Sequence, residues 1–381
     1  METDLSSIIC IADMNVTPAL DQCLADLALP EVFVQSAKQM SLLDKQQFFG
    51  MRSVTKLEES RALIYRLFVP SVYEAGVMQR IAEATDLKMG GRGCIFSQRI
   101  NFYRGTPFHY DIDALEKLRE KTPKTPPQEH ALISCTISRG TANALAQAVL
   151  ELGVCVPIVF FGFGVGMRDK LGLLRITIPV EKEIIWFIVP RSDAELVDKN
   201  LIPRARLDVP GQGFLYNTFI HAPVVNLRVR HGKRLHAATM EQVIAALDEV
   251  NGSSDWRRLV SRKGRTAASE MKSINTCGLF FIGEEEEVET FRRMAMANGA
   301  RGATLNALEM RSYSASDEEQ DMGSHSRQLC DIITSPETEA RILNALTQSE
   351  LFNSKSTCLL KTFSVETPSV IRSSAPTGER S

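Results

Sequence analysis

The stretch from Ala131 to Lys233 constrains the fold most, because runs typical of strands and helices alternate along it. An apolar run over 131–137 predicts a buried strand, and the spacing of Leu145, Val149 and Leu152 predicts a helix after it. The elements expected next are strands at Val154–Phe161 and about Leu173–Val189, a helix capped by Ser192, a strand opened by 210–213, and a strand over Val224–Arg230. The first six of these elements follow the order β-α-β-β-α-β, which is that of the ferredoxin-like unit.

The same order recurs on both sides of this stretch. In the first part of the chain, strands are expected at 6–12, 31–35, 61–70 and 94–103, with helices starting at Thr17 and Val72. In the last part, strands are expected at 275–282, 303–310, 329–333 and 356–365, with helices over 284–298 and from Ser335. The sequence therefore predicts an α+β protein built from three ferredoxin-like βαββαβ units.

The repeats and the segments between them give an expected domain organisation. Polar and proline-containing connectors separate the repeats, and the Ser/Thr/Pro-rich end of the chain predicts disorder. The expected segments are a first repeat at 1–105, a linker at 106–129, a second repeat at 130–233, a helical linker at 234–273, a degenerate third repeat at 274–366, and a disordered tail at 367–381.

Composition and charge exclude several classes of protein. The net charge of −2 gives no basic field for nucleic acid, and the basic stretch 257–265 is interpreted as a solvated connector. The eight cysteines form no CxxC or zinc spacing, which favours reduced thiols in a cytoplasmic protein. The longest apolar run, 154–165, is far shorter than the ~20 residues of a membrane span. We expect a cytoplasmic protein that is not inserted in a membrane and binds no nucleic acid.

Three short motifs in the second repeat resemble those of the PII signalling proteins. Gly162-Phe163-Gly164 ends the second strand of the repeat, and Gly211-Gln212-Gly213 opens its fourth strand. The run Arg228-Val229-Arg230-His231-Gly232 resembles the Arg-x-Arg-x-Gly that closes the family's unit. The resemblance rests on all three motifs occurring in this order on these elements.

This resemblance implies an assembly and a ligand. PII proteins are homotrimers that bury the open faces of their sheets around a three-fold axis. A chain with three units would complete that ring alone, as an intramolecular pseudo-trimer and a monomer. An adenine nucleotide lies between neighbouring PII subunits, so the resemblance implies nucleotide contacts at Gly162, Phe163, Gly164, Gly211, Gln212, Gly213, Arg228 and Arg230, and in a second cleft at Gly91, Arg92, Gly93 and Arg104.

Chemistry suits these residue types to phosphate binding, but the sequence also departs from the family. Glycine lets backbone N–H groups approach an anion, and arginine pairs with phosphate oxygens. However, Gly166 replaces a glutamine of the family, and Phe214 and Cys94 replace a basic residue. The third repeat has Phe352-Asn353-Ser354-Lys355 where a glycine loop is expected. Ordinary strand-end turns and strand-edge charges remain the alternative interpretation of these motifs.

Two functions remain open after these observations. One is a regulatory protein that binds an adenine nucleotide or small anion and controls a protein target, such as a transporter or an enzyme. The other is a protein-interaction scaffold whose clefts have lost their ligand. An enzyme is not expected, because the sequence shows no nucleophile–base pair and no metal cluster, and its six histidines are scattered. No cofactor is expected beyond the possible nucleotide.

Overall fold

The computed structural model describes residues 4–45, 54–87, 89–105, 108, 110–119, 128–153, 155–166, 180–209, 211–226, 230–231, 273–313, 325–352 and 357–368. Arg228 and nearly all of the expected helical linker and of the expected tail lie outside these residues. We call 5–105 the N-terminal segment, 128–231 the middle segment and 273–368 the C-terminal segment.

Each segment runs through the element order β-α-β-β-α-β, and shorter elements lie between them. The strands are β1 (Leu5–Asp13), β2 (Val32–Lys45), β3 (Val54–Pro70), β4 (Gly93–Arg99), β5 (Phe102–Gly105), β6 (Gln128–Ser138), β7 (Ile158–Gly166), β8 (Val180–Pro190), β9 (Gly213–Asn226), β10 (Arg230–His231), β11 (Ser273–Gly283), β12 (Gly302–Arg311), β13 (His325–Thr334) and β14 (Leu359–Pro368). The helices are α1 (Thr17–Asp26), α2 (Glu74–Ala84), α3 (Ile112–Arg119), α4 (Ala142–Leu152), α5 (Ala194–Arg204), α8 (Glu285–Ala297) and α9 (Pro336–Thr347).

The prediction of three ferredoxin-like units arranged as a pseudo-trimer is wrong, because the strands form one large, mainly antiparallel sheet. This sheet has 14 strands, in the order β10-β2-β3-β1-β4-β9-β6-β8-β7-β12-β13-β11-β14-β5. The segments join where β4 pairs with β9, where β7 pairs with β12, and where β2 pairs with both β7 and β12. The physical reason is that an edge strand leaves backbone N–H and C=O groups unpaired, and strands from another segment satisfy them here.

Several helix boundaries follow directly from local sequence. Ser335 caps α9 by accepting a hydrogen bond from the backbone of Thr338, and Pro336 fills the first helical position. Glu284 and Glu287 form a capping box at the start of α8. Gly299 ends that helix with a positive φ of 106°, as the Asn298-Gly299 pair predicts.

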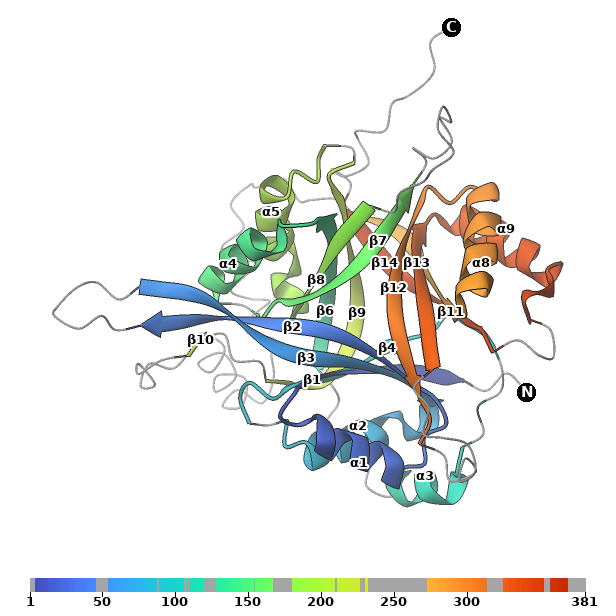
Figure 1. Cartoon of the computed structure of the whole chain (residues 1–381), viewed down its shortest axis with the longest axis horizontal. Helices are drawn as coiled ribbons and strands as arrows, with labels where there is room; N and C mark the ends of the chain where they lie inside the picture. The colour runs from blue at the N-terminus through green and yellow to red at the C-terminus, as the bar shows by residue number, and fades with distance from the viewer. Residues whose placement is uncertain are drawn as a thin grey trace, which may run out of the picture.

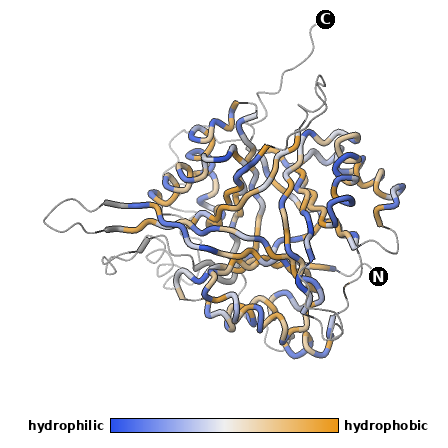
Figure 2. The backbone as a smooth tube through the Cα atoms, viewed as in Figure 1, coloured by the Kyte–Doolittle hydropathy of each residue, from blue (hydrophilic) through white to orange (hydrophobic). Residues whose placement is uncertain are grey.

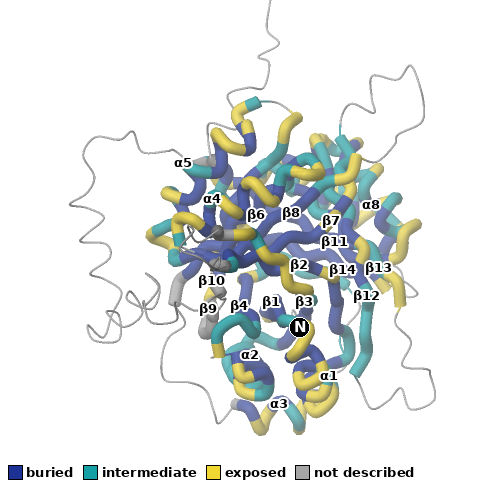
Figure 3. Tube along the Cα trace, turned by 60° about the vertical axis from the view of Figure 1, so that its left-hand side comes forward, coloured by how far each residue is buried: buried dark blue, intermediate teal, exposed yellow. Residues whose placement is uncertain are grey.

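The helices cover the outer face of the sheet in three groups. Figure 1 shows α1, α2 and α3 below the strands, α4 and α5 at one side, and α8 and α9 at the other. Each group packs on a buried apolar cluster of its own segment, and the cluster of the middle segment also includes residues of the N-terminal segment. Buried residues concentrate in the strands, while the helices expose their outer sides (Figure 3). No helix among the described residues is long and apolar enough to span a bilayer.

The opposite face of the sheet is buried by contact between segments. A fourth apolar cluster combines Phe33 and Phe68 of the N-terminal segment, Tyr216 of the middle segment, and Phe280 and Phe363 of the C-terminal segment. In Figure 2, hydrophobic and hydrophilic residues alternate along the strands. Some polar residues of the strands are buried, among them Gln35, Arg66 and Lys361. The inner face therefore holds the molecule together and includes buried polar groups.

Candidate functional site

A groove of about 500 Å³ lies beside the middle of β2. Its walls come from the turn between β1 and α1, from β2, from the outer part of β3, from the turn before β4, and from one residue of the middle segment. The lining residues are Asp13, Asn15, Val16, Gln39, Met40, Ser41, Glu58, Glu59, Ser60, Gly90, Gly91, Arg92 and Val156.

Backbone hydrogen bonds hold the two turns of the groove side by side. The amide of Asp13 donates to the carbonyl of Arg92 at 2.9 Å, and the amide of Met14 donates to the carbonyl of Arg61 at 3.2 Å. Gly93 follows with φ 141°, and a Cβ added there would lie 1.9 Å from the carbonyl oxygen of Ile11. Glycine at this position is therefore required for the close approach of the two turns.

Gln39 provides a polar group in the groove that has no hydrogen-bond partner among the described residues. Only 4% of this residue is exposed, and its Nε2 makes no hydrogen bond to the described residues. The next residue, Met40, donates its backbone N–H to the carbonyl of Pro157 in the middle segment at 3.0 Å. A buried amide without an acceptor costs about 1–3 kcal/mol. A ligand oxygen in the groove could satisfy this amide if the Gln39 side chain turns toward the groove, because Nε2 itself is buried.

The charges around the groove are mixed. Arg92 is partly exposed, donates to the carbonyl of Thr85 at 3.3 Å, and lies 3.5 Å from a carboxylate oxygen of Asp86. Asp13 accepts hydrogen bonds from the backbone and side chain of Asn15. Glu59 pairs with Lys38 at 2.7 Å. The groove thus offers both donors and acceptors to a small polar ligand.

Residues expected in two different clefts lie in neighbouring parts of the sheet. They are the Gly91–Gly93 turn, expected in the second cleft, and Arg230, expected in the first. Gly91 and Arg92 line the groove, and Gly93 pairs with Asn226 at the end of β9. Arg230 lies in β10, which runs parallel to β2, with its backbone opposite Leu42. The end of β9 therefore pairs with the strand that follows the Gly91–Arg92 turn, and β10 pairs with β2, whose middle residues line the groove. Arg228 lies outside the described residues.

The Gly162-Phe163-Gly164 motif lies elsewhere, inside β7. Gly164 is opposite Val180 of β8 on one side and Thr304 of β12 on the other. A Cβ on Gly162 would come within 2.7 Å of Asn306 Oδ1 and 2.8 Å of the carbonyl oxygen of Leu305. The missing side chain at Gly162 lets β12 approach β7, and Gly164 leaves room for the Lys182 side chain of β8. Sheet pairing engages the backbone that was expected to contact phosphate.

The remaining expected residues do not line the groove either. Gly211 has φ 85°, which suits a turn, and Gln212 follows it with its amide bonded to the carbonyl of Val209. A Cβ on Gly213 would lie 2.5 Å from the carbonyl oxygen of Thr136 on β6. Arg104 lies in β5, and its guanidinium stacks over the ring of Phe352 at 4.7 Å. These residues have structural contacts, and their role in nucleotide binding stays a prediction.

Sequence reasoning missed a cluster of buried charges on the inner face of the sheet. Lys361 of β14 donates to Ser7 Oγ at 2.9 Å and to Gln98 Oε1 at 2.8 Å. Arg66 of β3 donates to Gln35 Oε1 at 2.8 Å. The signal was present as a charged residue within an apolar strand, which is rare unless the charge has buried partners.

Burial shifts the protonation equilibria of this cluster. Desolvation lowers the pKa of Lys361 to about 7 and that of Arg66 to about 10. The same cause raises the pKa of Asp331 to about 7, and the hydroxyl of Tyr216 donates to that carboxyl at 3.4 Å. Because these side chains come from all three segments, the cluster links the segments in the interior.

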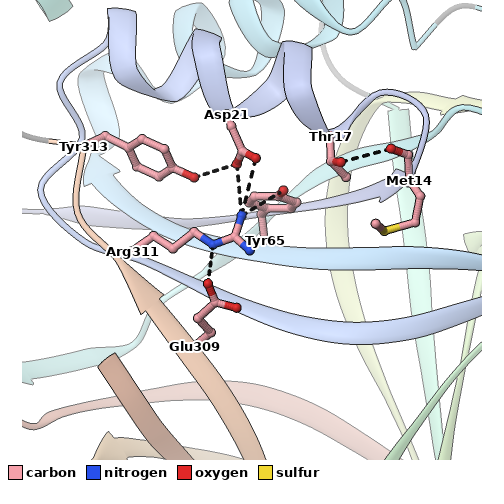
Figure 4. A network of polar contacts seen from close by, with 7 residues as sticks. All are labelled: Met14, Thr17, Asp21, Tyr65, Glu309, Arg311 and Tyr313. Carbon is pink, nitrogen blue, oxygen red and sulfur yellow. Dashed lines mark hydrogen bonds and ion pairs between the residues drawn. The ribbon is translucent and has the colours of Figure 1, made fainter. Parts of the chain in front are cut away.

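A second polar network joins α1 to the C-terminal segment (Figure 4). Asp21 of α1 accepts hydrogen bonds from the Tyr313 hydroxyl at 2.6 Å and from Arg311 Nη1 at 3.2 Å. Arg311 also donates to Glu309 at 2.7 Å. At the start of the same helix, the Thr17 hydroxyl donates to the carbonyl of Met14 next to the groove. The network therefore fixes the helix whose first turn borders the groove.

Comparisons with known proteins give no family for this chain. No model of a known protein family matches it, and no curated protein does. Among the described residues there is also no group of three or more His, Cys, Asp or Glu side chains placed to hold a metal. The geometry of the groove is thus the main guide to function.

Proposed function

We propose that this chain is a PII-like regulatory protein that binds an adenine nucleotide, or another small anion, in the groove beside β2. The observation that carries the proposal is the meeting of the Gly91–Arg92 turn with the buried, unpartnered amide of Gln39. Ligand binding would then alter contacts with a protein target. This makes the chain a binding protein rather than an enzyme.

The groove residues suit a phosphate in different ways. Within the described part of the chain, the Arg92 guanidinium is held by a 3.3 Å hydrogen bond and a 3.5 Å ion pair, so it can turn toward an anion at little cost. Gln39 Nε2 makes no hydrogen bond to the described residues, so it can donate to a ligand oxygen once its side chain turns toward the groove. Arg230, whose backbone pairs with β2, is a further candidate for a phosphate contact. Arg228, which lies outside the described residues, is another candidate by its place in the sequence motif.

The acidic residues of the groove favour a ligand with few negative charges. Asp13, Glu58 and Glu59 line the same space as Arg92. Their carboxylates repel a triphosphate more strongly than a single phosphate. AMP and cyclic AMP are therefore expected to bind more tightly than ATP.

Calorimetry on the full chain with ATP, ADP, AMP and cyclic AMP tests the proposal. We expect saturable binding of at least one nucleotide, and an Arg92→Ala variant should weaken it about tenfold, as expected for loss of one charge-assisted contact. Arg293→Ala is the matched control, because Arg293 is an exposed arginine on α8 paired with Glu289. Absence of binding by all four nucleotides would count against the proposal.

The protein-interaction scaffold remains the second candidate. It is favoured by the strand-packing contacts that account for Gly162 and Gly213 without any ligand. If it is correct, a protein captured by this chain should be retained equally with and without nucleotide. Capture should also be unchanged in the Arg92→Ala and Arg228→Ala variants.

A further inference from the structure

Asp198 and Asn217 form a buried pair that the proposed function does not use. Asp198 lies on α5 and is 3% exposed, and Asn217 lies on β9 and is 9% exposed. Asn217 Nδ2 donates to Asp198 Oδ2 at 2.6 Å. This bond occupies one oxygen of the acid and the amide nitrogen of the asparagine.

The other oxygen of each side chain has no hydrogen-bond donor. Asp198 Oδ1 and Asn217 Oδ1 are both buried and make no hydrogen bond to any described residue. A carboxylate has only acceptor atoms, and the oxygen of an amide is also an acceptor. With a charged Asp198, the pair therefore contains two buried acceptors without a donor, which is a costly arrangement.

The opposite orientation of the asparagine amide leads to the same deficit. The nitrogen and oxygen of an amide are assigned from their hydrogen bonds, so a rotated Asn217 has to be considered. Rotation would place two oxygens 2.6 Å apart, a distance that two acceptors reach only with a proton between them. In the rotated orientation, a proton on Asp198 supplies the donor that the 2.6 Å contact lacks. In the other orientation, a proton removes the charge from a buried carboxyl group whose Oδ1 has no donor among the described residues.

The surrounding charges also oppose an ionised Asp198. The charged neighbours that act on it are Glu195 on its own helix and Glu366 on β14, and both are acids. The thiol of Cys135 on β6 is close enough for its own pKa to be raised by Asp198. Burial is the largest effect and raises the pKa of Asp198 to about 7, although the bond from Asn217 lowers it.

We propose that Asp198 carries a proton in the folded chain, and that loss of this proton above neutral pH weakens the junction between β9 and β14. At this junction Asn217 is the residue opposite Glu366. The adjacent Thr218 donates its hydroxyl to the carbonyl of Ser364 at 3.1 Å. An ionised Asp198 would add a third carboxylate beside Glu195 and Glu366 where the middle and C-terminal segments meet.

The direction of the pH effect follows from proton linkage. The folded-state pKa of Asp198 lies above its ordinary value of 3.8, so the folded chain binds more protons between these two values. The contribution of Asp198 protonation to the free energy of unfolding is at its maximum below about pH 4. It falls as pH rises toward 7 and is constant above that. The change corresponds to the uptake of one proton on folding.

The first test measures unfolding by denaturant between pH 5 and pH 9 for the wild type and Asp198→Asn. A carboxamide keeps an N–H donor that cannot be lost, so we expect the variant to lose a pH dependence equivalent to one proton. Asp198→Ala removes the donor and should be less stable than Asp198→Asn at pH 5. Equal pH dependence in the wild type and Asp198→Asn would overturn the proposal.

A second test does not depend on the folding of an Asp198 variant. Carbon-13 NMR of the aspartate carboxyl groups in the wild type should show one carboxyl that titrates near neutral pH. Glu195→Gln and Glu366→Gln should each shift that titration to lower pH, because each removes a neighbouring acid, and this identifies the signal. If every aspartate titrates in its ordinary range, Asp198 is not protonated and the proposal fails.

Discussion

The turn at Gly91–Gly93 and the strand at Gly162–Gly164 contain similar glycine motifs that serve different physical ends. The first motif borders the groove, where Gly91 adopts φ 87°. The second lies in β7 with strands on both sides, and the missing side chain at Gly162 makes room for β12. Glycine can supply either an unusual backbone angle or the absence of a side chain. Only the neighbouring strand reveals which property is used.

The largest expected effect comes from Gly93→Ala. The new Cβ would collide with the carbonyl of Ile11 at 1.9 Å and would also meet an unfavourable φ of 141°. We expect a loss of about 4 kcal/mol or more in the free energy of unfolding. Gly140→Ala is the control: its φ is 87° with nothing within 4 Å, so it should lose only about 1 kcal/mol from backbone strain. Denaturant unfolding of both variants measures the difference.

Gly162→Ala should have the next largest effect. Its Cβ would press on Asn306 and Leu305 of β12, and we expect a loss of about 1–3 kcal/mol in unfolding free energy. Gly166→Ala is the control, because its added Cβ would lie 3.9 Å from its nearest neighbour, the carbonyl oxygen of Arg301. It should change the free energy of unfolding by less than about 0.5 kcal/mol. If Gly162→Ala were as stable as wild type but lost nucleotide binding, the motif would be a ligand loop after all.

Replacing the two buried glutamines of β2, Gln39 and Gln35, should change the free energy of unfolding by a smaller amount and in opposite directions. Gln39→Leu removes an unpartnered amide, so the empty protein should gain about 1 kcal/mol of stability while ligand affinity falls about tenfold. Gln35→Leu is the matched control, because Gln35 bonds Arg66 and Asn306, and it should lose about 1–3 kcal/mol. Thermal unfolding with and without AMP distinguishes them. A destabilised Gln39→Leu would show that Gln39 is structural.

The smallest effect is expected for Phe163→Ser in the strand motif. This ring is 46% exposed and points to the outer face of β7, so nucleotide affinity should be unchanged and stability should change by less than about 0.5 kcal/mol. Calorimetry under the conditions used for Arg92→Ala provides the check. A clear loss of nucleotide affinity would show that the ligand binds at the glycine motif of the middle segment and not in the groove.

Local sequence signals predicted much of the structure because they depend on near neighbours. The helix start at Ser335-Pro336 and the helix end at Gly299 are confirmed, and each rests on the chemistry of one turn. The single continuous sheet was not predicted. Which outer strands meet depends on contacts such as Glu309 with Val34, between residues far apart in the sequence.

The candidate site was predicted only where its residues carry a local sequence signal. The turn at Gly91–Gly93 was named from its glycines, which carry a local signal. Gln39 was missed, because its burial depends on Pro157 and Ile158 of another segment packing beside β2. Lys361 could have been noticed as a cation in an apolar strand, but its partners Ser7 and Gln98 lie in the first hundred residues and cannot be inferred from spacing.

The position of β14 in the sheet has a consequence for synthesis on the ribosome. This strand is translated after the other strands, yet it pairs with β5, β9 and β11 and delivers the ammonium group that bonds Ser7. Until it emerges, β5 and β11 keep edges able to pair with other chains. A chain terminated before Leu359 would therefore expose strand edges that can pair with other chains. We expect chaperones to stay bound until β14 has been synthesised and has joined the sheet.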